Sequence, residues 1–130
     1  MNITTRLAPP GMYPVFEQQR AMALKLRLSD AAARIARLRR LERVVLAHKL
    51  EIYEALAADL HKPEAEADLS ELMPVLSEIR HTIRHLRGWM KTRRVAPTMA
   101  MLGTQARIRY EPKGVTLIIS PWNYPINLTL

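Results

Sequence analysis

The feature that most constrains this chain is a nearly continuous apolar run close to its end, at residues 115–119. The run reads VTLII and is rich in β-branched side chains. Such a run is typical of a strand that is covered on both faces, as strands are in the parallel sheet of an α/β domain. The sequence therefore predicts an α/β fold, in which this run is a strand of a parallel sheet.

A parallel sheet also sets a requirement on the length of the chain that follows its first strand. The next parallel strand can pair only after a crossover of about a dozen or more residues, which is usually a helix. Eleven residues follow Ile119. We therefore expect the chain to be the truncated front part of a longer subunit.

The chain before this run is mostly helical by its pattern, over about residues 14–91. Residues 14–27 contain strong helix formers and no internal breaker, which predicts a first helix. Ser29 or Asp30 can cap a second helix, whose apolar positions recur at spacings of three, four and seven residues up to Leu60. We expect this helix to contain a break near His48.

A third helical stretch covers residues 64–91 and carries an apolar stripe spaced alternately by three and four residues. This spacing predicts a helix that packs against another helix along most of its length, most simply the preceding one. Pro74 interrupts the stretch and predicts a kink or a restart near Met73. The stripe consists of Leu69, Leu72, Leu76, Ile79, Ile83, Leu86 and Met90.

Strand character returns after the helices. Arg93 to Gly103 is predicted to be a loop, and Ala106, Ile108 and Tyr110 then alternate with arginines, as in a half-exposed strand. The predicted organisation has four parts: an irregular leader at 1–13, a helical region at 14–103, a strand and turn at 104–114, and the first strand and turn of a truncated domain at 115–130.

Composition limits the classes of function. The formal net charge is +8, which fits either a basic helical interaction module that binds nucleic acid or a partner helix, or a basic piece of a larger protein. Basic residues at 34–43 lack aromatic interleaving, so a solvated helix face is favoured and we expect no nucleic-acid partner. The sequence has no signal peptide and no membrane segment, which favours a cytoplasmic location.

Two histidines could be considered for a metal site. His81 and His85 lie one helical turn apart, but the HTIRH segment lacks the glutamate of the zinc-protease motif. We therefore expect no metal site. The chain also contains no cysteine, which excludes disulfides, thiolate ligands and a cysteine nucleophile within it.

The turn after the apolar run places an asparagine between two prolines. In SPWNYP, Pro121 and Pro125 restrict the backbone on either side of Asn123, at the carboxyl end of the predicted strand, where open α/β sheets bind ligands. The segment GVTLIISPWNYPINLTL resembles the opening of the cofactor-binding domain in NAD(P)-dependent aldehyde dehydrogenases. The helical stretch ALAADLHKPEAEADLSELMPVLSEIRHTIRHLRGWMK resembles the N-terminal region of the class 3-like branch, which includes fatty-aldehyde and coniferyl-aldehyde dehydrogenases. The RIRYEPKG segment resembles the strand and turn before the family's Pro-Trp-Asn motif. The resemblance implies that residues 115–119 begin a Rossmann-like sheet.

This resemblance implies an activity, a cofactor and roles for named residues. Family members oxidise aldehydes to carboxylic acids with NAD or NADP through a cysteine thiohemiacetal, and they form homo-oligomers through a region that 104–114 resembles. Asn123 takes the role of a donor to the oxyanion, which an uncharged amide can stabilise without titrating. Pro125 would begin the next helix. Contact with the cofactor falls on Ile118, Ile119, Ser120, Pro121 and Trp122.

Other interpretations of these residues stay open. Asn123 alone could be a turn residue that satisfies local backbone, and Trp122 could serve packing rather than ligand contact. Because the chain has no cysteine, it lacks the nucleophile of the family. We therefore expect it to be inactive on its own, as one piece of an active site.

Overall fold

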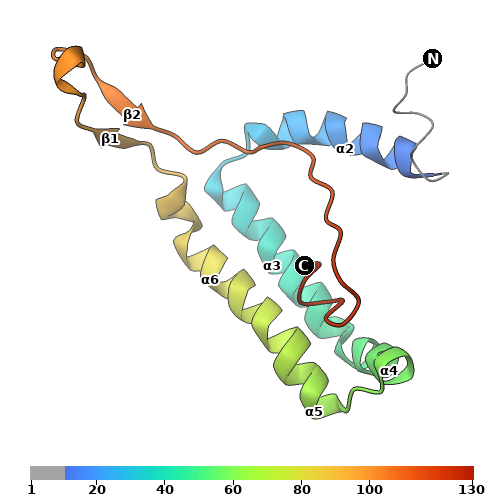
Figure 1. The fold of residues 1–130 in the computed structure, drawn as a ribbon. Coiled ribbons are helices and arrows are strands. Elements are labelled where there is room, and N and C mark those ends of the chain that lie inside the picture. The colour runs from blue at the N-terminus through green and yellow to red at the C-terminus, as the bar shows by residue number, and fades with distance from the viewer. Residues whose placement is uncertain (1–10) are drawn as a thin grey trace.

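The computed structural model describes residues 11–130, as a helical body with a thin arm and a long returning segment (Figure 1). Two long helices lie side by side and are joined at one end by shorter ones. A two-stranded arm projects from the other end, and the chain then runs back alongside the body to a turn near the short helices. The elements run in the order α2, α3, α4, α5, η1, α6, β1, η2 and β2.

The first helix, α2 (Met12–Arg27), confirms the predicted helix and begins two residues earlier than Pro14. Pro14 fits in the first helical turn because an N–H group there has no intrahelical partner to lose. No residue of α2 is buried. Residues 1–10, most of the predicted leader, lie outside the described residues.

The second predicted helix is divided as expected, into α3 (Ala31–Ala47) and α4 (Lys49–Leu60). The Asp30 side chain accepts a hydrogen bond from the Ala33 N–H at 2.8 Å, so Asp30 is the N-cap. His48 ends α3 and starts α4. His61 closes α4 in the left-handed conformation, with φ 54°, which turns the chain sharply before Pro63.

The predicted disturbance at Pro74 takes the form of a π-helical turn. The chain continues from α5 (Glu64–Ala67) into η1 (Asp68–Leu72), which is a π-helix, and then into α6 (Met73–Trp89). Pro74 occupies the first turn of α6, where its missing N–H is tolerated. The helix therefore restarts at Met73, as its sequence predicts.

The core lies where the short helices meet the long ones. Leu72 is fully buried and Leu56 is 4% exposed, and both belong to one apolar cluster with Val45, Tyr53 and Ala67. Helices α3 and α6 pack against each other along the body. This contact confirms that the stripe of residues 69–90 packs on a preceding helix, although Leu69 at its beginning is 65% exposed.

The arm corrects one prediction. Arg93–Val95, predicted as loop, forms β1 and pairs in antiparallel fashion with β2 (Ala106–Ile108), with Arg93 opposite Ile108. A short 3-10 turn, η2 (Met99–Met101), lies between them. Two arginines in succession break the apolar alternation of a half-buried strand, and both strands of this arm are largely exposed, so the pattern could not reveal β1.

The predicted buried strand at 115–119 is wrong for this structure. Residues 109–120 run as an extended segment outside any strand, and Leu117 and Ile119 are 70% and 87% exposed. A strand requires a neighbour with which its backbone can hydrogen-bond. Among residues 11–130 the only sheet is the β1–β2 pair, so this run has an apolar composition without a ladder to join.

Candidate functional site

The candidate site is the docked turn, which we define as residues 121–130. The Leu128 N–H donates to the Tyr124 carbonyl and the Leu130 N–H donates to the Ile126 carbonyl, both at 3.1 Å. These bonds have helical spacing, but the structure forms turns rather than the helix predicted to begin at Pro125. The docked turn therefore has local order of its own and lies against the short helices of the body (Figure 1).

A buried ion pair fixes the docked turn to the body. Lys62 Nζ lies 2.7 Å from Glu71 Oε1 and donates a second hydrogen bond, also 2.7 Å, to the Asn123 carbonyl. The other carboxylate oxygen of Glu71 accepts from the backbone N–H groups of Ile126 and Asn127, at 3.1 and 2.9 Å. The turn is therefore held on both sides of its centre by groups from the helical body.

A further contact uses the backbone disturbance at Pro74. The Asn127 side-chain amide donates to the Ser70 carbonyl at 3.0 Å. In an unbroken α-helix that carbonyl would accept from residue 74, but a proline has no N–H to donate. The proline thus leaves this carbonyl available to the docked turn.

Asn123 is exposed, and its main chain is fixed while its side chain is not. The carbonyl is bound by Lys62, yet within residues 11–130 no hydrogen bond engages the side-chain amide. This contrasts with Asn127, whose amide is used for docking. Of the two asparagines in the docked turn, Asn123 is the one whose donor is available to a ligand.

The residues predicted to contact a cofactor lie together in and beside the extended segment. Ile118, Ile119 and Trp122 are 59%, 87% and 88% exposed, and Pro121 is exposed as well. Ser120 is half-buried, and its hydroxyl lies 2.6 Å from that of Thr129 across the turn. The segment therefore presents apolar side chains and an unpaired extended backbone, which fits one wall of a binding site.

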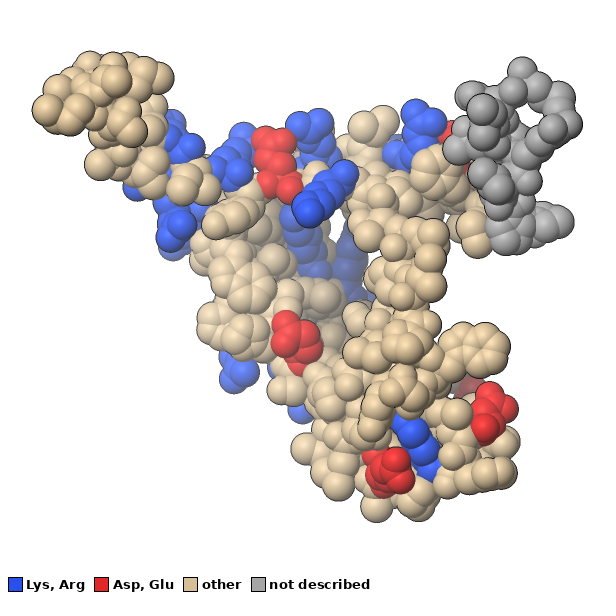
Figure 2. Space-filling view, in the orientation of Figure 1, with Lys and Arg blue, Asp and Glu red and all other residues tan. Residues whose placement is uncertain are grey.

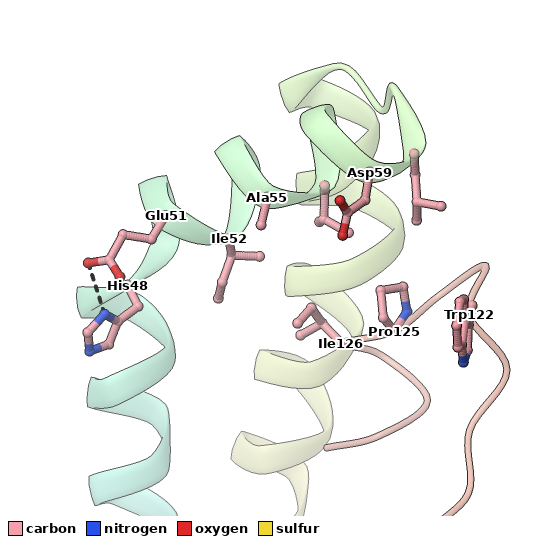
Figure 3. Close-up of a pocket in the computed structure, with 10 residues that line it drawn as sticks. His48, Glu51, Ile52, Ala55, Asp59, Trp122, Pro125 and Ile126 are labelled. Carbon is pink, nitrogen blue, oxygen red and sulfur yellow. Dashed lines mark hydrogen bonds and ion pairs between the residues drawn. The ribbon is translucent and has the colours of Figure 1, made fainter.

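An open groove separates the docked turn from α4 (Figure 3). Its volume is about 750 Å³, and Trp122, Pro125 and Ile126 line one side, with Ile52 and Ala55 of α4 on the other. At one end, His48 Nδ1 lies 3.0 Å from Glu51. The groove is lined mostly by apolar atoms, and no sequence pattern predicts it.

A polar network at the other side of α4 ties that helix to the π-helical turn. The Tyr53 hydroxyl donates to the Asp68 carboxylate, and Lys49 lies 2.9 Å from the same carboxylate. The hydrogen bond from Tyr53, followed by that from Lys49, lowers the pKa of Asp68 below its ordinary value of 3.8. Burial is the main reason that the pKa of Tyr53 is raised.

Sequence reasoning missed Lys62 and Glu71. Lys62 follows the end of α4, where a cation is favourable in any helix, and Glu71 lies inside the apolar stripe, so neither position singles out a site. A carboxylate next to the fully buried Leu72 was the one available signal, because a buried charge requires a partner. Nothing in the spacing identified that partner, or the backbone groups some fifty residues further on.

Charge on the visible face does not form one separate basic surface. Figure 2 shows Lys and Arg spread from the arm across the region next to α2, with acidic residues among them. Arg27 lies 2.8 Å from Glu111, Arg80 2.6 Å from Glu42, and the Arg34 side chain donates to Ser29. Several of the basic side chains therefore have partners within the chain.

Two absences apply to the described part of the chain. In residues 11–130, no helix is both long and apolar enough to cross a membrane. The same residues contain no cluster of three or more metal-ligating His, Cys, Asp or Glu side chains. The His81 and His85 rings lie 4.2 Å apart between centroids in a tilted arrangement, and the His85 ring stacks on Trp89 at 5.8 Å.

Comparison with known proteins identifies the family. The model of the aldehyde dehydrogenase family matches residues 15–130. Mouse aldehyde dehydrogenase family 3 member B1 is 45% identical over 104 residues, covering 80% of this chain and 22% of the relative. The probable coniferyl aldehyde dehydrogenase of Caulobacter vibrioides is 32% identical over 133 aligned residues, covering 99% of this chain and 27% of the relative.

A solved structure agrees with these relatives. The substrate-bound state of Staphylococcus aureus AldH superposes with a TM-score of 0.84 at 30% identity, covering 98% of this chain and 26% of that one. The chain belongs to the aldehyde dehydrogenase family. Within that family it is class 3-like, and it spans about a quarter of the length of these relatives.

The comparisons also bear on the sequence predictions. The family, its class 3-like branch and the α/β fold class are confirmed. The alternative of a basic interaction module finds no support among the relatives. The four-part division of the chain and the roles of Asn123 and residues 118–122 stay predictions.

Proposed function

We propose that the protein to which this chain contributes oxidises aldehydes to carboxylic acids with NAD or NADP, and that Asn123 donates to the oxyanion of the reacting aldehyde. The observation that carries this proposal is the contrast within Asn123 itself. Its carbonyl is held 2.7 Å from Lys62, while its side-chain amide has no partner among residues 11–130. A fixed backbone with an available amide is what an oxyanion donor requires, because the donor must be in place before charge develops.

The extended segment supplies the chain's contribution to the cofactor site. Residues 118–122 fit one side of a dinucleotide site, since their apolar side chains are exposed and their extended backbone joins no ladder. The dinucleotide, when bound, supplies the hydride acceptor of the oxidation. Ile118, Ile119 and Trp122 would exclude water from it, and the two prolines and Ser120 would keep the path of the backbone fixed.

The nucleophile of the reaction is supplied from outside these 130 residues, because they contain no cysteine. We expect the chain alone to lack turnover. A cytoplasmic location stays an expectation from the sequence.

The arm is proposed to contact another copy of the protein in a homo-oligomer. This proposal is supported by the resemblance of residues 104–114 to the family's oligomerisation region and by the exposure of both strands. Replacing Ile108 by Lys at the paired end of the arm should shift the whole protein to smaller species in light scattering. An unchanged mass would contradict this assignment.

The catalytic proposal is tested by Asn123→Ala in the whole protein. We expect kcat to fall about 100- to 1000-fold, as for loss of one oxyanion donor, while cofactor affinity measured by fluorescence stays within about twofold. Asn127→Ala is the matched control, because its amide docks the turn and points at Ser70 instead. We expect that control to lose less than about tenfold. Equal losses in the two variants, or none in Asn123→Ala, would contradict the role of Asn123.

A further inference from the structure

Lys62 and Glu71 form the buried ionic contact of the described residues. Glu71 is fully buried and Lys62 is 9% exposed, and they are the two charged residues buried within 11–130. Each is fully engaged. Glu71 divides its two oxygens between Lys62 and the docked turn, while Lys62 donates to Glu71 and to the Asn123 carbonyl and lies 4.1 Å from the centre of the Tyr124 ring.

Stability of the fold does not by itself explain why two charged side chains are buried here. Removing both from water costs about as much as their attraction returns, so well-packed apolar residues often serve as well. Such residues could not donate to the Asn123 carbonyl or accept from the Ile126 and Asn127 amides. What this pair adds, and an apolar pair would not, is a fixed position for the backbone of the docked turn.

The contacts of Lys62 and Glu71 with the docked turn lie at Asn123 itself and a few residues after it. Lys62 binds the carbonyl of Asn123 itself, and Glu71 binds the two N–H groups three and four residues later. Between them, Pro125 restricts the backbone. A rotation of the Asn123 peptide would break the bond from Lys62, and a shift of the whole turn would break both bonds to Glu71.

We propose that Lys62 and Glu71 are positioning residues that hold the Asn123 amide where the oxyanion forms, an inference that rests on the proposed role of Asn123. Neither touches the reacting atoms, and each acts through the backbone of the docked turn. Because an amide displaced by about 1 Å loses much of its effect on a developing charge, the pair influences kcat from the opposite side of the turn.

The test uses the double variant Lys62→Met with Glu71→Gln in the whole protein. This change leaves no unpaired buried charge, keeps an acceptor for the Ile126 and Asn127 amides, and removes the donor to Asn123. We expect kcat to fall about 10- to 100-fold, with KM for aldehyde and cofactor within about twofold. The single variant Lys62→Arg keeps a cationic donor and should retain more of kcat than the double variant.

A cycle with Asn123→Ala separates this inference from the catalytic proposal. If the pair acts through Asn123, adding the double variant to Asn123→Ala should lower kcat by less than about twofold further. Losses that multiply in the triple variant would overturn the positioning role, as would a double variant with unchanged kcat. If Asn123→Ala alone keeps its kcat, the role of Asn123 is refuted and the positioning role is overturned with it, whereas a loss in Asn123→Ala beside an unchanged double variant overturns the positioning role alone.

A structural readout distinguishes positioning from general stability. In the whole protein, hydrogen exchange at the Ile126 and Asn127 amides, which bind Glu71, should quicken at least tenfold in the double variant, while exchange in α3 and α6 changes little. Quickening spread evenly over the helices would show that the pair serves the fold as a whole, and would overturn the inference.

Discussion

The helical body and the returning segment are held in place in different ways, although apolar residues make up a similar fraction of each. In the body, α3 and α6 pack against each other and bury Ile35, Val45 and Ile79, and α4 buries Leu56. In residues 109–120 the β-branched run stays exposed, and the docked turn is held by hydrogen bonds to a few groups of the body. The difference shows that an apolar composition allows a segment to be buried, but that burial occurs only where another helix or strand packs against it.

The largest expected effect is therefore an apolar truncation in the body. Leu72→Ala removes a fully buried side chain from the core, and we expect the free energy of unfolding of this chain to fall by about 2–5 kcal/mol in urea titrations. Ile119→Ala is the matched control in the other region, because Ile119 is 87% exposed, and it should change stability by less than about 0.5 kcal/mol. Similar losses in both would show that the two regions share one core.

A smaller effect is expected at the contact that joins the regions. Asn127→Ala removes the amide that donates to the Ser70 carbonyl, a change we expect to cost about 1 kcal/mol of docking. The measurement is hydrogen exchange of the Ile126 and Leu128 amides, which should quicken about fivefold, while α3 amides keep their protection. If α3 amides quicken equally, the turn is a structural part of the body.

An effect of similar size is confined to the body. Asp30→Ala removes the N-cap of α3 and should lower the free energy of unfolding by about 1 kcal/mol. Asp30→Ser keeps an acceptor at the cap and should lose clearly less. Hydrogen exchange should report the loss in α3 and leave the docked turn unchanged. Exchange that quickens in the turn as well would remove the distinction between the two regions.

The smallest expected effect is a pH dependence of the body. Because hydrogen bonds lower the pKa of Asp68 in the folded chain, its contribution is present above 3.8 and is lost as pH falls below that value. Asp68→Asn should therefore flatten the loss of stability between about pH 4 and pH 2, followed by circular dichroism. If the variant loses stability at low pH as steeply as the unchanged chain, Asp68 does not contribute to the pH dependence of stability. Hydrogen exchange in the docked turn should be the same with and without the Asp68→Asn substitution.

The body could be predicted from the sequence because its signals are local. The spacing of apolar residues predicts α3, α4 and α6, and Ser29 or Asp30 predicts a helix start, of which Asp30 is the cap. The β1 strand was missed because its largely exposed residues, Arg93–Val95, show no apolar alternation. The run at 115–119 was predicted to be a strand because its composition describes a covered strand, while the ladder that defines one depends on a neighbour.

The candidate site was predictable only in part. The SPWNYP motif located the turn and singled out Asn123, since rigid prolines around a polar residue are a local signal. Lys62 and Glu71 were not identified as its support, because their partners are backbone groups of Asn123, Ile126 and Asn127, which any residue types would offer. Contacts to main-chain atoms leave no signature at the position that is contacted.

The attachment of the docked turn has a consequence for the order of folding. The groups that hold it, Lys62, Ser70 and Glu71, precede it by 55 to 61 residues, so every one of these contacts closes a long loop. During synthesis, the two long helices leave the ribosome well before residues 121–130, and they can pair without them. We therefore expect the helical body to form first and to serve as the surface on which the asparagine turn acquires its shape.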